Sequence, residues 1–148
     1  MKRSAVFGME NNIIVLDASI VVKWFHEEEN TDVAVVVRER ILSGELLAIV
    51  PPLLFYEVDN ALNFKAGSQV EAIIAIHTIL TTLPFQVVEV VHTIINDAIR
   101  IAHHHRTSVY DAIYVALAIS IDAPLLTADK KLANLIGAPT IQLLSEYK

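Results

Sequence analysis

The chain has 148 residues, enough for one domain with a sizeable core and short for two. Hydrophobic residues make up 54% of it and charged residues 19%, which indicates a large core or an apolar surface that a partner covers. The absence of cysteine excludes a disulfide framework and a thiolate metal site. The net charge of −6 argues mildly against holding nucleic acid by bulk charge, although bound divalent cations would offset acids gathered at one site.

The N-terminal stretch MKRSAVFGMENN starts with basic residues but contains no apolar run long enough for a signal peptide. Later apolar stretches are interrupted well before the roughly 20 residues that a membrane span needs. We therefore expect a cytoplasmic protein that does not associate with membranes. Residues 1–12 precede the first predicted strand, so we interpret them as an N-terminal extension and residues 13–148 as a single domain.

Short β-branched runs alternate with longer amphipathic stretches along the chain. Thr31 or Asp32 is expected to cap the second helix, and Gly67 and Gly137 to end two later helices. The helix over 109–121 is nearly all apolar and is therefore expected to be central. In chain order, the predicted elements are strand Ile13–Leu16, helix Ile20–Phe25, helix Val33–Leu42, strand Leu46–Val50, helix 53–67, helix Val70–Leu80, strand Phe85–Val91, helix Ile94–His105, helix Val109–Ile121, strand Leu125–Leu126, helix Lys130–Ile136 and strand Thr140–Leu143.

Strands that alternate with helices favour a parallel sheet, because two parallel strands need a long crossover connection. The sequence therefore predicts a three-layer α/β/α fold with a central parallel sheet of about five strands. In open sheets of this kind, chemistry usually takes place in the crevice beyond the carboxyl ends of the strands.

Four acidic residues stand where a carboxylate needs an explanation. Asp17 follows the first predicted strand and Asp129 lies just past the fourth. Glu57 and Asp111 lie within apolar helical stretches, where a charge is costly unless something compensates it. Each acid also has a local explanation, because Asp17, Asp111 and Asp129 can belong to helix caps and Glu57 can lie on an exposed face. For Asp111, the capping partner would be Ser108.

A bound divalent cation is one cause that would gather all four acids. Mg²⁺ and Mn²⁺ take oxygen ligands, often one or two carboxylates with water. Two such ions about 4 Å apart can clamp the attacking and leaving oxygens of a phosphodiester. Four acids without cysteine suit that chemistry better than zinc chemistry.

Four motifs in this order, IIVLDASIVVKWF, PPLLFYEVDNAL, TSVYDAIYVALA and PLLTADKKLA, resemble a PIN domain of the VapC toxin type. The resemblance runs from about residue 13 to the C-terminus. It implies an endoribonuclease that depends on Mg²⁺ or Mn²⁺ and hydrolyses RNA phosphodiester bonds. By the same resemblance, the metal-binding and catalytic acids are Asp17, Glu57, Asp111 and Asp129, while Ser19, Thr127 and Ser108 line the cofactor site through their hydroxyls. The partners it implies are an RNA substrate, a second copy in a homodimer and a small antitoxin protein.

Other functions remain open on the residues alone. A phosphoacceptor receiver domain needs an acidic pair before its phosphorylated Asp, where this chain has IIVL before Asp17. A haloacid-dehalogenase phosphatase needs Asp-x-Asp where this chain has Asp17-Ala-Ser19. A non-catalytic PIN-fold scaffold that binds RNA or a protein is the main alternative, but a scaffold has no reason to keep four mutually repelling acids.

Several other residues suggest sites without establishing them. His103-His104-His105 invites a zinc interpretation, but successive helical residues point about 100° apart, so we interpret the run as a helix C-terminus. Tyr110, Tyr114 and Trp24 fit core or interface packing better than base stacking. The cations that flank the acid-bearing segments either meet phosphates or balance surface charge; they are Lys23, Arg106, Lys130 and Lys131.

Overall fold

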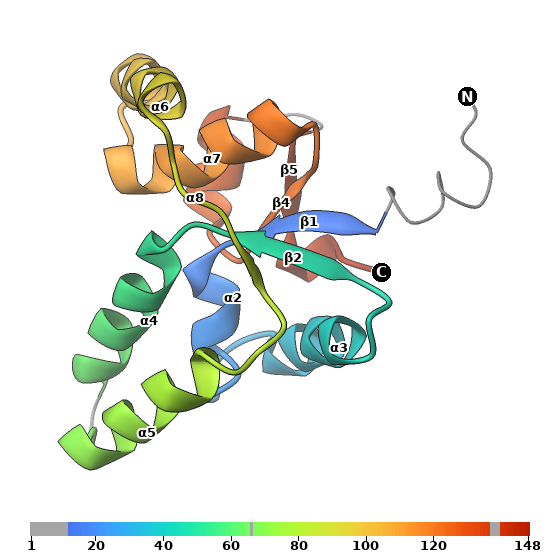
Figure 1. Ribbon diagram of the computed structural model, residues 1–148, viewed down its shortest axis with the longest axis vertical. Helices are drawn as coiled ribbons and strands as arrows, with labels where there is room; N and C mark the ends of the chain where they lie inside the picture. The colour runs from blue at the N-terminus through green and yellow to red at the C-terminus, as the bar shows by residue number, and fades with distance from the viewer. Residues whose placement is uncertain (1–11, 66, 137–139) are drawn as a thin grey trace.

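A five-stranded parallel sheet forms the centre of the structure, a computed structural model that describes residues 12–65, 67–136 and 140–148. The strand order is β3-β2-β1-β4-β5, and all neighbouring strands are parallel (Figure 1). The strands are β1 (Ile13–Leu16), β2 (Leu47–Val50), β3 (Gln86–Val87), β4 (Leu125–Thr127) and β5 (Ile141–Leu143). The fold class expected from the alternating apolar runs is confirmed.

Helices cover both faces of this sheet. In Figure 1, α6 and α7 lie on one side of β1 and β2, while α2 and α3 lie on the other. Strands covered on both faces read as continuous apolar runs, as β1 and β2 do. No helix within the described residues has the length and apolar character for crossing a bilayer. The helices are α2 (Ala18–Val22), α3 (Thr31–Leu42), α4 (Leu53–Asn63), α5 (Val70–Leu80), α6 (His92–His105), α7 (Val109–Ile121) and α8 (Lys130–Ile136), followed by the 3₁₀ turn η1 (Leu144–Glu146).

Helix α7 lies between α6 and the sheet, as its apolar sequence predicts. Residues 114–118 in its middle are buried. Small side chains let the two helices approach closely, because Ala98 and Ala102 of α6 pack against Ala112 and Ala116 of α7. This packing fixes the first turn of α7, which carries Asp111, over the carboxyl end of the sheet.

The third strand is much shorter than the predicted strand Phe85–Val91. Only Gln86–Val87 pairs with β2, opposite Ile49 and Val50, which are the last two residues of that strand. Phe85 instead turns into the core, where its ring stacks on Trp24 with 6.1 Å between centroids. The apolar residue Phe85 that contributed to the predicted strand pattern therefore belongs to the core packing just before β3.

The start of α3 was predicted incorrectly. The N-cap is Asn30, which adopts a left-handed conformation with φ of 64° and makes no side-chain capping bond. Thr31 and Asp32 both lie inside the first turn. The Thr31 Oγ1 instead accepts a hydrogen bond from the backbone N–H of Glu28 at 2.8 Å, so it stabilises the preceding loop.

Other helix ends differ from their predicted positions by a few residues. Helix α2 begins at Ala18, directly after the N-cap Asp17, and tighter turns replace α-helix beyond Val22. Helix α4 ends at Asn63, ahead of Gly67, whose φ of +76° suits a residue without a side chain. The expectations for residues 1–11 and for Gly137 lie outside the described residues.

Candidate active site

Asp17 is the most buried of the four predicted acids. Its side chain is 6% exposed, and it lies at the end of β1, next to the end of β4 in the sheet. The carboxylate Oδ2 accepts two hydrogen bonds, from Ser19 Oγ at 2.9 Å and from Thr127 Oγ1 at 2.6 Å. Asp17 occupies the N-cap position of α2 but makes no side-chain capping bond. Its carboxylate is therefore oriented by two hydroxyls and not by the helix.

Those two hydroxyls also hold the loop that follows β4. Ser19 Oγ accepts from the backbone N–H of Ala128 at 3.0 Å, and Thr127 Oγ1 accepts from that of Asp129 at 3.0 Å. Each hydroxyl thus accepts a hydrogen bond from a backbone N–H of the loop and donates one to the Asp17 carboxylate. This small network ties the acid at the end of β1 to the acid just past β4.

Glu57 lies on α4, half-buried, and is held by a residue that sequence reasoning assigned only to packing. The hydroxyl of Tyr114 donates to Glu57 Oε1 at 2.7 Å. Tyr114 is fully buried in α7, one helical turn beyond Asp111. That three-residue spacing, which puts Tyr114 on the same helix face as Asp111, is the sequence signal that could have identified it.

Asp111 and Asp129 both start helices, so their local explanations hold. Ser108 is the N-cap of α7, and its Oγ accepts from the backbone N–H of Asp111 at 3.0 Å. Asp129 Oδ1 accepts from the backbone N–H of Leu132 at 3.1 Å and so caps α8. Capping of α8 uses one carboxylate oxygen of Asp129, whereas capping of α7 uses only the backbone N–H of Asp111. Capping therefore leaves carboxylate oxygens at both positions for another ligand.

The pKa values of Asp17, Glu57 and Asp111 are raised by burial and by the charges of neighbouring acids. Burial is the main cause that raises the pKa of Asp17, and the charges of Asp111 and Asp129 raise it further against its two hydroxyl bonds. Burial likewise raises the pKa of Glu57, with contributions from the charges of Asp17 and Asp111. The pKa of Asp111 is raised by burial and by the charge of Asp129. Charges of neighbouring acids therefore add to burial in disfavouring the ionised forms of Asp17, Glu57 and Asp111.

The pKa of Tyr114 is also raised by these acids. Burial raises the pKa of its hydroxyl, and the charges of Asp17, Glu57 and Asp111 raise it further. The hydroxyl therefore stays protonated and acts as a permanent donor to Glu57.

A cation would relieve this repulsion, and the donor set fits a hard ion. Every group offered is a carboxylate or hydroxyl oxygen, which is the ligand type of Mg²⁺ and Mn²⁺. Across the described residues, no three or more His, Asp or Glu side chains are arranged to hold one ion by themselves.

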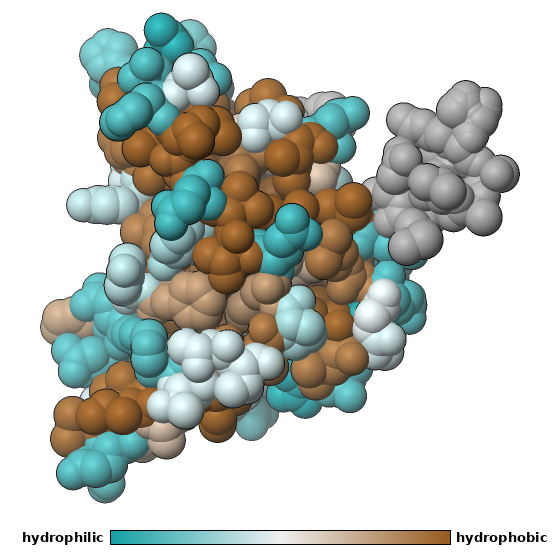
Figure 2. Space-filling view, in the orientation of Figure 1, coloured by the Kyte–Doolittle hydropathy of each residue, from teal (hydrophilic) through white to brown (hydrophobic). Residues whose placement is uncertain are grey.

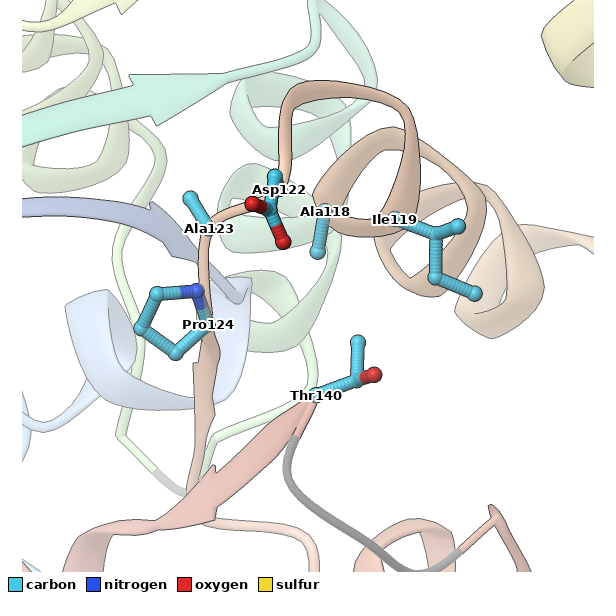
Figure 3. Close-up of a pocket in the computed structure, with 6 residues that line it drawn as sticks. All are labelled: Ala118, Ile119, Asp122, Ala123, Pro124 and Thr140. Carbon is cyan, nitrogen blue, oxygen red and sulfur yellow. The ribbon is translucent and has the colours of Figure 1, made fainter. Parts of the chain in front are cut away.

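The cavity in Figure 3 lies away from these acids. Its volume is about 360 Å³, and it lies near Pro124 and Thr140, which precede β4 and β5. None of the four acids lines it. It is therefore at the amino edge of the sheet, whereas the acids lie at the carboxyl edge. The lining residues are Ala118, Ile119, Asp122, Ala123, Pro124 and Thr140.

The histidine run lies at the end of α6, as predicted. The rings of His104 and His105 meet edge to face with centroids 4.7 Å apart. His105 Nδ1 is 3.1 Å from the backbone oxygen of Leu135 in α8, a contact that its Nδ1–H tautomer makes as a donor. The run therefore joins two helices that border the acids.

Comparisons with known proteins agree with this fold. Residues 14–137 match the family model of the PIN domain. Ribonuclease VapC1 of Mycobacterium tuberculosis is 54% identical over 35 residues, which is 24% of this chain and only 26% of that relative. The chain thus spans about a quarter of the length of the curated relative it matches.

Solved structures share the fold over nearly their whole length. PAE2754 from Pyrobaculum aerophilum has a TM-score of 0.62 and 24% identity, with 89% of this chain and 90% of that chain covered. Mycobacterium tuberculosis VapC20, a toxin that cleaves the sarcin–ricin loop, has a TM-score of 0.66 and 16% identity, with 87% and 98% covered. A toxin–antitoxin complex from Klebsiella pneumoniae has a TM-score of 0.65 and 14% identity, with 88% and 97% covered. The family match covers residues 14–137, most of the chain, and agrees with the five-stranded parallel sheet, so the chain belongs to the PIN domain family.

Proposed function

We propose that this protein is a metal-dependent endoribonuclease and the toxin of a toxin–antitoxin pair. The observation that carries the proposal is the buried carboxylate of Asp17, which two hydroxyls orient among three further acids. An ionised carboxylate that is 6% exposed, among like charges, is costly unless a cation binds there during function. A catalytic metal site is a direct reason to retain it.

Each acid would contribute to holding the ion in a defined way. Asp17 presents a fixed carboxylate because Ser19 and Thr127 restrain Oδ2. Glu57 is restrained at Oε1 by Tyr114, which leaves Oε2 for the ion or its water. Asp111 and Asp129, at the starts of two helices, would supply further carboxylate oxygens, directly or through water. Restraint of this kind lets the site keep its geometry when charge develops on the substrate.

A divalent ion, when bound, supplies positive charge that stabilises the scissile phosphate and activates water for in-line attack. The chain's own residues then orient that water and the phosphate. No side-chain nucleophile is required, and the side chains that bond to the Asp17 carboxylate are the hydroxyls of Ser19 and Thr127.

A non-catalytic PIN scaffold is the second candidate. A scaffold would need the fold but not the arrangement around Asp17, in which burial and two neighbouring charges raise the pKa. Neutral side chains at the same positions would avoid that penalty at no cost to packing. The retained acids therefore favour the enzyme.

A homodimer and an antitoxin would cover apolar surface that the structure leaves exposed. Figure 2 shows hydrophobic side chains on one face over α6 and α7, and also at the lower left where α5 lies. Large exposed side chains include Phe64 at 78%, Tyr56 at 68% and Ile74 at 60%. Structures of the same fold include VapBC2 from Rickettsia felis and FitAB, each bound to DNA. We propose that a second copy of the chain and an antitoxin protein cover these patches here.

The decisive experiment compares RNA cleavage by the wild type, Asp17→Asn and Asp122→Asn. Asp122 is a matched control, because it is an exposed acid at the amino edge of the sheet. We expect Asp17→Asn to lose at least about 100-fold in rate, as loss of a main electrostatic group does, with unchanged circular dichroism. Asp122→Asn should retain full activity.

Metal dependence is tested on the same proteins. Excess chelator should abolish cleavage by the wild type, and added Mn²⁺ or Mg²⁺ should restore it. Cleavage that continues at full rate in chelator, or that survives in Asp17→Asn, would rule out the proposed mechanism.

A further inference from the structure

A second cavity, of about 360 Å³, lies between α4, α5 and β3. In Figure 1, α4 leaves the sheet at the tip of β2, and α5 runs back beside it toward β3. The volume of this cavity falls within the range of roughly 300–1,000 Å³ that is usual for small-ligand sites. We call it the aromatic pocket, and its lining residues are Pro52, Phe55, Tyr56, His77, Thr81 and Val87.

The aromatic pocket lies at the same edge of the sheet as Asp17. Pro52 follows the carboxyl end of β2, and Val87 is the last residue of β3. The β1–β2 register, continued past the last paired residues, brings Asp17 level with Pro51, the residue directly before Pro52. Neighbouring strands lie about 4.8 Å apart, so the pocket begins on the order of 5–10 Å from Asp17 across the sheet. A nucleotide next to a phosphate bound at Asp17 can therefore reach it.

Two aromatic side chains line the pocket. Tyr56 is 68% exposed and directly precedes Glu57 in α4. Phe55 is held by an edge-to-face contact with Phe85, with 6.4 Å between the ring centroids, and Phe85 in turn stacks on Trp24. The pocket thus has one exposed ring beside a ring that is fixed by the core. Exposed aromatic rings are the groups on which proteins stack the bases of single-stranded RNA.

His77 and Thr81 add hydrogen-bond acceptors to the pocket. His77 Nδ1 lies 2.7 Å from Asp59 Oδ2, to which its Nδ1–H tautomer donates, and this tautomer has Nε2 as an acceptor. Thr81 Oγ1 donates its proton to the backbone oxygen of Thr78 at 2.7 Å, so toward a ligand the hydroxyl acts as an acceptor. The two residues are four positions apart at the end of α5 and face the same side of the helix.

We propose that the aromatic pocket binds one base of the RNA substrate and prefers a base with an exocyclic amino group to uracil. This inference rests on the proposed ribonuclease function and adds a specificity site to it. Adenine, cytosine and guanine each carry an amino donor, whereas uracil has only carbonyl oxygens outside its ring. Two acceptors on the protein pair with an amino group but oppose a carbonyl, which leaves lone pairs unsatisfied. Stacking on Tyr56 supplies affinity for every base.

The test measures the binding of short single-stranded RNAs to the Asp17→Asn protein, with Mg²⁺, so that the RNA stays intact. No antitoxin is added, because a partner that covered Tyr56 would close the pocket. The probes are oligocytidylate and oligouridylate of equal length, which carry the same number of phosphates and differ in the base. We expect the cytidine RNA to bind about 10-fold more tightly than the uridine RNA.

Three further substitutions in this background separate stacking from base recognition. Tyr56→Ala should weaken the binding of both RNAs by about 10-fold, because a base loses its stacking platform. Phe64→Ala is the matched control and should leave both affinities unchanged, because Phe64 is 78% exposed directly after α4 and does not line the pocket. Thr81→Val keeps the shape of the side chain but should reduce the preference for cytidine to about 2-fold. Thermal melts of each protein check that the fold is retained.

The outcomes distinguish this inference from the proposed activity. If Tyr56→Ala binds both RNAs as Phe64→Ala does, the inference is wrong, and loss of a dimer in Tyr56→Ala would assign the pocket to a second copy of the chain. If the protein with Asp17 intact cleaves no RNA but binding still depends on Tyr56 and Thr81, the pocket stands and the catalytic proposal falls. Cleavage at an unchanged rate in Tyr56→Ala and Thr81→Val, without base preference, would retain the activity and refute the pocket.

Discussion

Replacing Asp111 by asparagine should affect stability in opposite directions with and without metal. Asparagine keeps the shape of the side chain and the backbone N–H that Ser108 caps, so the main change is the loss of the charge. Burial and the charge of Asp129 raise the pKa of Asp111, against stabilising hydroxyls of Ser108 and Thr107. The ionised Asp111 therefore destabilises the metal-free fold.

The size of this effect follows from Coulomb's law. Two carboxylates on the order of 5 Å apart repel by roughly 3 kcal/mol at an effective dielectric of about 20. Because Asp111 is only half-buried, solvent screening reduces this to about 1 kcal/mol. In chelator at neutral pH, Asp111→Asn should therefore melt about 2–4 °C above the wild type.

Bound Mn²⁺ should reverse that order. A ligand at about 100 times its Kd stabilises the native state by about 2.7 kcal/mol, and the variant with one acid fewer gains less. The assay is a pair of thermal melts on each protein, in chelator and in excess Mn²⁺, with Asp122→Asn as the control that shows no crossover.

The pH dependence has a definite sign. A carboxylate whose pKa is raised on folding binds more protons in the folded state, so its penalty is fully present above the folded pKa. The penalty disappears as the pH falls below the unfolded value of about 4. The advantage of Asp111→Asn in chelator should therefore vanish in acid. A loss of several kcal/mol in chelator at neutral pH would refute this reasoning and show that the carboxylate mainly stabilises the helix start.

Three further predictions address the site and the assembly. Thr127→Val removes a donor to Asp17 and an acceptor for the N–H of Asp129, so the free energy of unfolding in urea should fall by about 1–3 kcal/mol. Thr127→Ser should restore most of this loss. Tyr114→Phe frees Glu57 Oε1, so we expect the free energy of unfolding to fall by about 1 kcal/mol and kcat to change more than KM does. A loss of active protein through poor folding, with kcat of the folded fraction unchanged, would contradict this role. Light scattering at micromolar concentration should report a dimer, and a monomer at every concentration would leave only the antitoxin to cover the apolar patches.

The sequence by itself determined the fold class and where the acids lie along it. Buried strands such as β1 read as unbroken β-branched runs, and parallel strands end at one edge of a sheet, so the order of residues alone assigns Asp17 and Asp129 to the same edge. The apolar helix that carries Asp111 is assigned to the interior for the same kind of reason. These features follow from local periodicity and from general rules of chain connection.

Only the tertiary structure decided which groups contact one another. Thr127 reaches Asp17 across 110 residues, and Tyr114 reaches Glu57 across 57 residues, so no local pattern contains either bond. Pairing also decided which cations remain free, because Lys23 is held by Glu28 whereas Arg106 is not paired within the described residues. Periodicity reports which face of an element is buried, whereas a hydrogen bond or an ion pair depends on distances of about 3 Å between elements, which only the packed fold sets.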